Sequence, residues 1–133
     1  MANTNRMVRI AVFLLAAMVA FPQVADAKNY LFRFRNTSGS PLQVQLYADS
    51  RDNIWPSANE TWVYPADGRI YVNGISCHRG EMICFGAWIE GRSDFYWGTG
   101  RGKQNRCDSC CYRCSGQQTE IINLNPPDLS LHD

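Results

Sequence analysis

The chain has 133 residues, of which 45% are hydrophobic and 19% are charged. That length suits one small domain and excludes a large enzyme with its own cofactor domain, because a domain usually spans about 100–200 residues. The formal net charge is +1, so no overall field attracts nucleic acid or an anionic membrane. The hydrophobic content is also too high for a disordered chain.

Residues 1–27 are predicted to be a secretory signal peptide that is cleaved after Ala27. Two arginines give a positively charged start, an apolar run follows over residues 10–21, and small residues precede the cleavage point. The run is shorter than the roughly 20 residues of a membrane-spanning helix. We therefore expect a mature protein with no stable membrane anchor and no nucleic-acid partner, located in the periplasm or secreted.

The mature chain begins with a pattern that is typical of β-strands. Aromatic residues alternate with arginines over residues 30–35, and leucine and valine alternate with glutamine over residues 42–46. The turn-forming residues 36–41 between them predict an antiparallel hairpin. Further short segments, separated by turn residues, are also predicted to be strands: residues 60–64, 69–75, 82–90, 95–99 and 119–124.

The spacing of these segments predicts the fold class. The Asp67-Gly68 pair suits a tight hairpin turn between residues 60–64 and 69–75. About seven short strands with turns between them indicate a single all-β domain over residues 28–124, a small antiparallel β-sandwich. Residues 125–133 carry no periodic pattern, and we expect a loose C-terminal tail.

Six cysteines all lie after residue 27, and an even number in a small exported chain predicts three disulfides. Cys77 and Cys84 bracket a short loop near one expected hairpin end, while Cys107, Cys110, Cys111 and Cys114 form a tight cluster. Neighbouring Cys110 and Cys111 should have different partners, because a bond between them would strain the peptide. We also expect at least one disulfide between the cluster and the Cys77/Cys84 pair, which would make residues 106–114 a stapled loop or short helical turn.

Two other interpretations of the cysteines remain. Paired CxxC motifs with His78 nearby resemble zinc ligands, but in a helix the outermost sulfurs would lie about 10 Å apart, too far to share one ion. Thiol redox catalysis by CxxC normally needs a βαβ setting, which the strand pattern does not predict. We therefore expect neither a metal nor a cofactor.

No hydrolase or phosphate-binding motif occurs in the sequence, and we expect a protein that is not an enzyme. A small hydrolase with carboxylates from separate strands remains a weaker alternative.

Tryptophan and tyrosine are frequent, and exposed rings stack on sugars or anchor protein interfaces. By strand parity Phe85 and Trp88 lie on opposite faces, and Trp55, in a loop before a proline, is the ring most expected to be exposed. The expected contact residues are these aromatic and basic side chains: Trp55, Trp88, Trp97, Tyr112, Arg101, Lys103 and Arg106.

The segments ICFGAW at residues 83–88, WGTG at residues 97–100 and CDSCCYRC at residues 107–114 resemble a group of small exported, cysteine-rich bacterial proteins. The resemblance covers roughly residues 30–124 and implies a secreted or periplasmic bacterial domain, with no activity to carry over.

The leading hypothesis is a non-enzymatic binding module for a cell-envelope glycan or an extracytoplasmic protein. The alternative is a secreted inhibitor or toxin-like effector that acts on a foreign protein, for which a stapled loop would be a rigid wedge.

Overall fold

The computed structural model describes residues 27–126. The predicted signal peptide, apart from Ala27, and most of the predicted tail lie outside the described residues. Apart from one short 3₁₀ turn, η1 (Arg101–Lys103), the regular secondary structure of the described residues consists of β-strands. The strands are β1 (Ala27–Asn36), β2 (Leu42–Ala48), β3 (Ile54–Trp55), β4 (Trp62–Tyr64), β5 (Ile70–His78), β6 (Met82–Ile89), β7 (Arg92–Gly98), β8 (Cys111–Arg113) and β9 (Gln118–Leu124).

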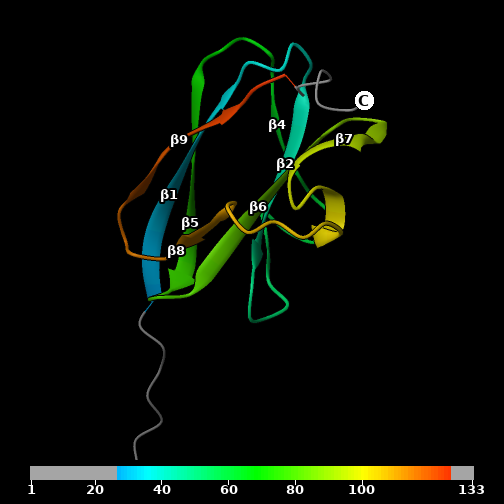
Figure 1. Ribbon diagram of the computed structural model, residues 1–133. Coiled ribbons are helices and arrows are strands. Elements are labelled where there is room, and N and C mark those ends of the chain that lie inside the picture. The colour runs from blue at the N-terminus through cyan, green and yellow to red at the C-terminus, as the bar shows by residue number, and fades with distance from the viewer. Residues whose placement is uncertain (1–26, 127–133) are drawn as a thin grey trace, which may run out of the picture.

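These strands form two sheets that pack as a sandwich (Figure 1). The three-stranded sheet has the order β5-β1-β9, and the six-stranded sheet has the order β3-β2-β6-β7, with β4 paired to β2 and β8 paired to β6. The all-β sandwich is therefore confirmed. One pairing departs from the antiparallel expectation, since β9 runs parallel to β1.

The core lies between the two sheets and follows from the alternation in the sequence. Phe32 and Phe34 of β1, and Leu42 and Leu46 of β2, are fully buried. Phe34 also meets Phe85 of β6 edge to face, with ring centroids 5.6 Å apart. Full burial of one such side chain contributes about 1.5–3 kcal/mol, so these residues hold the two sheets together.

Both predicted hairpins are wrong. β1 pairs with β5 and β9 whereas β2 pairs with β6, and β4 pairs with β2 whereas β5 pairs with β1. Each of the two turns therefore carries the chain from one sheet to the other. At the first of them, buried Asn36 donates from Nδ2 to the carbonyl oxygens of Ser40 (2.8 Å) and Tyr64 (3.0 Å), which satisfies the backbone of the crossing. Turn-forming residues serve such a crossing as well as they serve a hairpin.

The connection from β5 to β6 also crosses between sheets, so Cys77 and Cys84 do not flank a hairpin end. The structure adds two strands that the sequence pattern did not predict, the very short β3 and β8. β8 occupies part of the segment 106–114 that was expected to be a loop or helical turn, and the helical turn lies earlier, at η1. Among the described residues, no helix has the length and apolar character needed to cross a membrane.

Candidate functional site

The three disulfides join Cys77 to Cys114, Cys84 to Cys111 and Cys107 to Cys110. Cys110 and Cys111 therefore have different partners, as predicted. Two bonds tie the cluster to β5 and β6, where the sequence predicted at least one. Because every cysteine is paired, none is left as a thiolate ligand for zinc or as a free redox thiol. Disulfides of this density are typical of proteins outside the reducing cytoplasm.

Three of the four aromatic contact residues face the core rather than solvent. Trp55, Trp97 and Tyr112 are half-buried and pack against the core cluster. The Tyr112 ring meets Phe32 edge to face at 5.8 Å, and burial, with the nearby Glu120 carboxylate, raises the pKa of Tyr112 to about 12. The expected platform of exposed rings, with Trp55 foremost, is therefore wrong, because these side chains close the edges of the sandwich.

Trp88 is buried too, although it points away from the core. Phe85 and Trp88 of β6 lie on opposite faces of the six-stranded sheet, as parity predicted, yet only 8% of Phe85 and 3% of Trp88 are exposed. Both faces of β6 must therefore be covered. Within the part of the chain that the structure describes, the large aromatic side chain that is exposed is Tyr96 of β7. It lies opposite Trp88 in the register and was not predicted as a contact residue.

One face of β6 packs against the three-stranded sheet. The other face is covered by a segment that we call the covering loop, residues 99–110. β7 and β8 pair end to end with the same edge of β6, and the covering loop is the excursion between them. Its two ends are hydrogen-bonded to β6, since Thr99 N donates to the Phe85 oxygen (3.0 Å) and Phe85 N donates to the Cys110 oxygen (3.1 Å). The loop approaches so closely that a Cβ at Gly86 would overlap the carbonyl oxygen of Gly100, which explains the glycine there.

Buried polar groups fix the covering loop to the outer face, the face turned away from the three-stranded sheet. The Tyr47 hydroxyl donates to Gln45 Oε1 (2.7 Å) and accepts from Gly102 N (3.0 Å). Burial raises the pKa of Tyr47, so the hydroxyl stays protonated. Gln45 Nε2 in turn donates to the carbonyl oxygens of Ser57 (3.1 Å) and Glu60 (2.8 Å). These bonds hold the β3–β4 segment on the same face.

Between these segments lie two adjoining hollows of about 430 and 500 Å³, which share Gln43, Trp88 and Arg101. We call them together the outer groove. The smaller hollow runs toward the turn between β6 and β7 and includes Glu90. The larger one runs toward the β3–β4 segment and is lined by these residues: Gln43, Gln45, Ile54, Ala58, Asn59, Thr61, Trp88, Arg101 and Gly102. Trp88 forms part of its floor, under a wall of neutral polar side chains.

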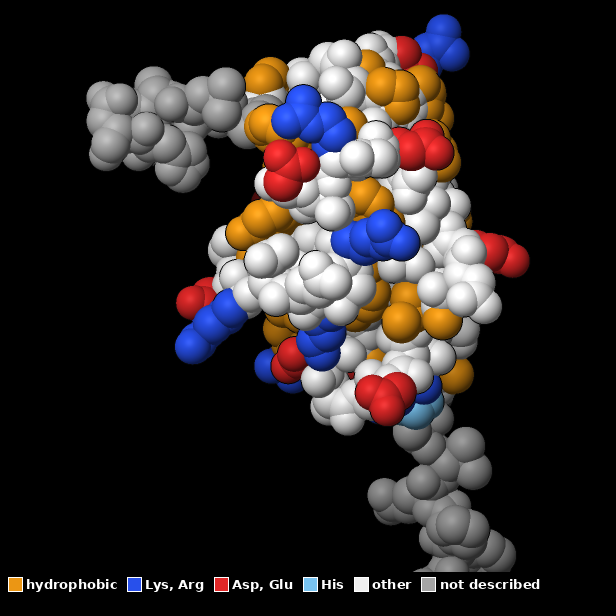
Figure 2. Space-filling model, turned by 90° about the vertical axis from the view of Figure 1, so that its right-hand side faces the viewer, with side chains coloured by type: hydrophobic (Ala, Val, Ile, Leu, Met, Phe, Trp, Pro, Cys, Tyr) orange, Lys and Arg blue, Asp and Glu red, His pale blue; other side chains and the backbone are white. Residues whose placement is uncertain are grey.

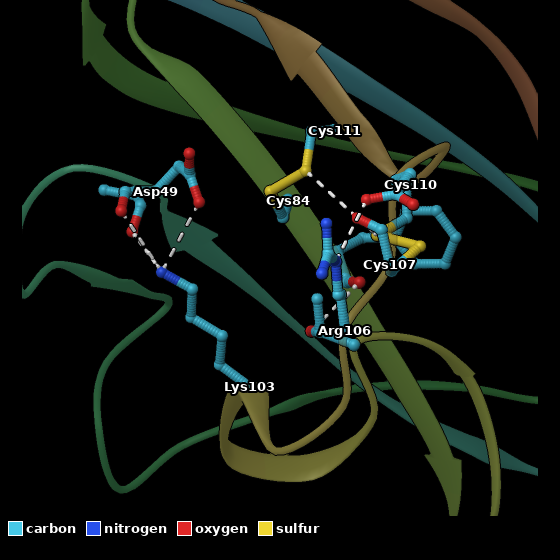
Figure 3. Close-up of a disulfide and its surroundings, with 11 residues drawn as sticks. Asp49, Cys84, Lys103, Arg106, Cys107, Cys110 and Cys111 are labelled. Carbon is cyan, nitrogen blue, oxygen red and sulfur yellow. Dashed lines mark hydrogen bonds and ion pairs between the residues drawn. A yellow bond between two sulfur atoms is a disulfide. The ribbon is translucent and has the colours of Figure 1, made fainter.

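A third hollow, of about 480 Å³, lies on the other side of the covering loop beside the Cys84–Cys111 disulfide (Figure 3). Two of the expected basic contact residues line it, and each has an acidic partner. Lys103 Nζ lies 3.7 Å from Asp49 Oδ1, and Arg106 Nε lies 3.5 Å from Asp108 Oδ1. Figure 2 shows the side of the molecule that carries β7 and η1, where basic side chains are spread singly among neutral and acidic ones. Among the described residues on this side, the basic side chains therefore do not gather into one patch.

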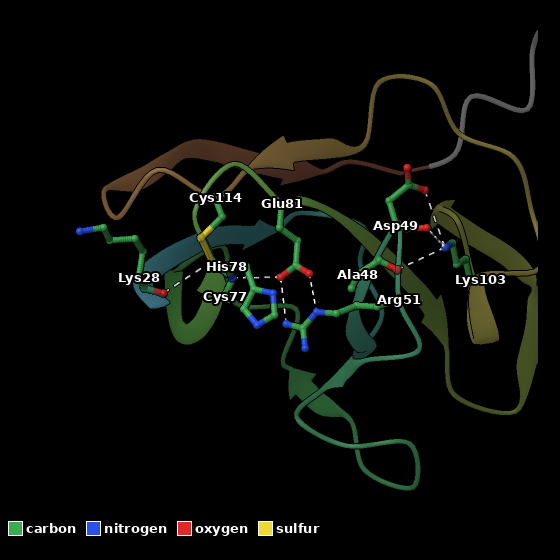
Figure 4. A network of polar contacts seen from close by, with 9 residues as sticks. All are labelled: Lys28, Ala48, Asp49, Arg51, Cys77, His78, Glu81, Lys103 and Cys114. Atoms are coloured by element: carbon green, nitrogen blue, oxygen red, sulfur yellow. Dashed lines mark hydrogen bonds and ion pairs between the residues drawn. A yellow bond between two sulfur atoms is a disulfide. The ribbon is translucent and has the colours of Figure 1, made fainter. Parts of the chain in front are cut away.

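A separate polar network joins the two sheets at the β5–β6 connection (Figure 4). Arg51, after β2, forms a two-point ion pair with the Glu81 carboxylate, which also accepts from His78 N (3.1 Å). The Arg51 guanidinium and the His78 amide lower the pKa of Glu81. His78 is the last residue of β5, and its backbone amide is part of this network.

The structure thus brings together Trp88 and Arg101, thirteen positions apart in the sequence, in one groove. It places Lys103 and Arg106 in the neighbouring hollow. Sequence reasoning missed the amide and hydroxyl side chains of Gln43, Asn59 and Thr61. The alternating glutamines of β2 were a signal for one polar face, but no local pattern showed that a distant loop would turn that face into a groove.

Comparisons of the chain with protein-family models, with curated proteins and with solved structures find no match.

Proposed function

We propose that the protein is an exported, non-enzymatic binding module that contacts a cell-envelope glycan through the outer groove. The observation that carries the proposal is the groove itself, in which neutral hydrogen-bonding side chains stand over the edge of a buried indole. Ligand sites commonly combine an apolar floor with a few placed polar groups. Sugars suit such a site because each ring offers hydroxyls beside apolar C–H faces.

The polar side chains of the outer groove differ in whether they have hydrogen-bond partners within the protein, and this difference supports a ligand site. Gln45 is fully engaged in holding the covering loop and the β3–β4 segment. By contrast, among the described residues the side chains of Gln43, Asn59 and Thr61 have no hydrogen-bond partner in the protein. These three side chains are therefore available to a ligand, while the groups behind them fix the shape of the groove.

The groove is also pre-organised, which lowers the entropic cost of binding. Its floor is a strand pair in register, with Gln43 opposite Trp88. The covering loop is bonded to β6 at both ends and closed internally by the Cys107–Cys110 disulfide. A ligand would therefore meet a surface that is already ordered.

The test is retention of the disulfide-intact protein on purified peptidoglycan sacculi and on insoluble envelope polysaccharide. We expect the double variant Gln43→Ala/Thr61→Ala to be retained about tenfold less, since each lost hydrogen bond contributes about 0.5–1.5 kcal/mol. The matched control is Gln118→Ala/Asn123→Ala, which removes two exposed side chains from the three-stranded sheet. Equal retention of both double variants and the native chain would refute the groove as a glycan site.

A protein partner, as expected for an inhibitor or toxin-like effector, is the second candidate. The observation in its favour is the outer face of the three-stranded sheet, where Leu31, Ile70 and Val72 are 39%, 42% and 51% exposed. Exposed apolar clusters are typical of surfaces that bind other proteins. Co-purification of a stoichiometric protein that is lost in Val72→Lys, without retention on sacculi, would favour this candidate over the first.

A further inference from the structure

The larger hollow of the outer groove contains a single charged residue. Arg101 stands among residues that are all uncharged. Its side chain is exposed, and within residues 27–126 it has no ion pair and no hydrogen bond. A lone cation in a neutral, polar hollow is an electrostatic feature that a purely neutral sugar would leave unused.

The neighbouring basic residues differ from Arg101 in this respect. Lys103, two positions along, is paired with Asp49, and Arg106 is paired with Asp108. Arg92 of β7, which lines the smaller hollow of the groove, is paired with Asp94 at 3.6 Å. Among these basic residues, Arg101 is therefore the one whose charge has no acidic partner within residues 27–126.

The backbone presents Arg101 in a fixed position. The flanking Gly100 and Gly102 have φ angles of 67° and 65°, a left-handed conformation that favours glycine. Gly102 N is held by the buried Tyr47 hydroxyl at 3.0 Å, and the positive charge of Arg101 acts on that hydroxyl. The side chain therefore starts from an anchored turn, so less entropy is lost when it binds.

We propose that the ligand is an acidic glycan, and that Arg101 recognises a sugar carboxylate of the hexuronic-acid type in the larger hollow. The guanidinium matches a carboxylate with two parallel hydrogen bonds, while Gln43 and Thr61 face the hydroxyls of the same or the next ring. The acid sits at the end of the groove near Asn59, where Arg101 is the one charged residue of the lining. The smaller hollow is less suited to it, because its lining adds the Glu90 carboxylate, and its own cation, Arg92, is already paired with Asp94. This inference rests on the proposed glycan function.

The experiment is a titration of ¹⁵N-labelled, disulfide-intact protein with tri-galacturonic acid and with its methyl ester, followed by NMR. The two probes differ in charge but not in hydroxyl pattern. We expect the acid to bind at least tenfold more tightly than the ester, with shifts at Arg101 Nε and in η1. Arg101→Gln should remove the difference between the probes, and Arg101→Lys should retain part of it.

The matched control is Arg106→Gln, which makes the same charge change at an exposed position of the same loop, outside the groove. It should keep the preference for the acid. Equal affinity for acid and ester, or equal losses in Arg101→Gln and Arg106→Gln, would overturn the role of Arg101 and leave a neutral-glycan site standing. If neither probe binds and sacculi retain nothing, the glycan function itself fails, together with this inference.

Discussion

The outer faces of the two sheets are built from similar strands but are buried very differently. On the three-stranded sheet, apolar residues such as Val72 and Leu31 remain exposed. On the six-stranded sheet, even polar residues are covered, since Gln45 is 6% and Tyr47 is 2% exposed. The difference comes from two segments that lie over this face, the covering loop between β7 and β8 and the β3–β4 segment, and not from the central strands themselves.

This contrast shows where a small sandwich can form a specific site. An uncovered sheet face offers a flat surface, and a ligand that binds there loses more entropy because most of the contacting groups must be ordered on binding. A covered face needs buried hydrogen bonds to hold the cover, and the same bonds fix the walls of the groove beside it. The candidate site therefore lies on the six-stranded sheet, whose outer face also bears the Cys84–Cys111 bond beside the third hollow.

The largest loss of stability is expected when the disulfide that joins the two sheets is removed, compared with the disulfide inside the covering loop. Cys77–Cys114 closes 37 residues between β5 and the segment after β8, whereas Cys107–Cys110 closes 3 within the covering loop. Because a cross-link stabilises more when its loop is longer, Cys77→Ala/Cys114→Ala should cost about 3–4 kcal/mol and Cys107→Ala/Cys110→Ala about 1–2 kcal/mol. Guanidinium unfolding followed by far-UV circular dichroism measures both. A larger loss from the second pair would mean that the covering loop, not the link between sheets, dominates stability.

A glycine on each outer face gives the next test. A Cβ at Gly86 overlaps the Gly100 oxygen, while a Cβ at Gly74, on the three-stranded sheet, lies 3.1 Å from the flexible end of Leu31. Gly86→Ala must push the covering loop away and should cost about 2–4 kcal/mol. Gly74→Ala should change the free energy of unfolding by less than about 1 kcal/mol. Similar losses of unfolding free energy for the two variants in the same assay would contradict close packing of the covering loop on β6.

The cover also depends on one buried hydroxyl. Tyr47→Phe leaves Gly102 N and Gln45 Oε1 without their partner and should cost about 1–2 kcal/mol, the penalty of an unpaired buried group. The control is Tyr71→Phe, whose hydroxyl donates to the exposed Asp67 carboxylate and whose loss should be much smaller. Hydrogen exchange should speed up at Gly102 in the first variant only. Unchanged exchange there would show that the hydroxyl does not hold the loop.

Strand positions could be predicted from the sequence because alternation is a local signal. β1, β2 and β9 lie close to where apolar and polar residues alternate. The partners of those strands could not be predicted, since the turns at residues 36–41 and 65–69 fit a crossing between sheets as well as a hairpin. Pairing is decided by core packing between residues far apart in the sequence, such as Phe34 and Phe85.

The candidate site was predictable only in part, for the same reason. Arg101 stood out as a basic residue, and the geometry of adjacent cysteines predicted that Cys110 and Cys111 have different partners, but the pairing itself could not be derived from the sequence. The burial of Trp88 did not follow, because strand parity assumes that one face of a sheet is open. Only an insertion that folds back can close the second face, and its path over Gly86 is a tertiary property.

The smallest effect is expected where the two sheets meet, away from either outer face. Glu81 is almost buried, with 4% of its side chain exposed, whereas its partner Arg51 is 36% exposed. Glu81→Gln should therefore cost only about 1 kcal/mol at neutral pH. Because the folded-state pKa of Glu81 is lowered, its stabilisation is complete above the unfolded pKa of about 4.3 and is lost as the pH falls through the folded value. Thermal unfolding of both chains between pH 7 and about pH 3 should show the native advantage disappearing toward acid. An advantage that is constant across this range would mean that the Glu81 carboxylate contributes by its shape and not by its charge.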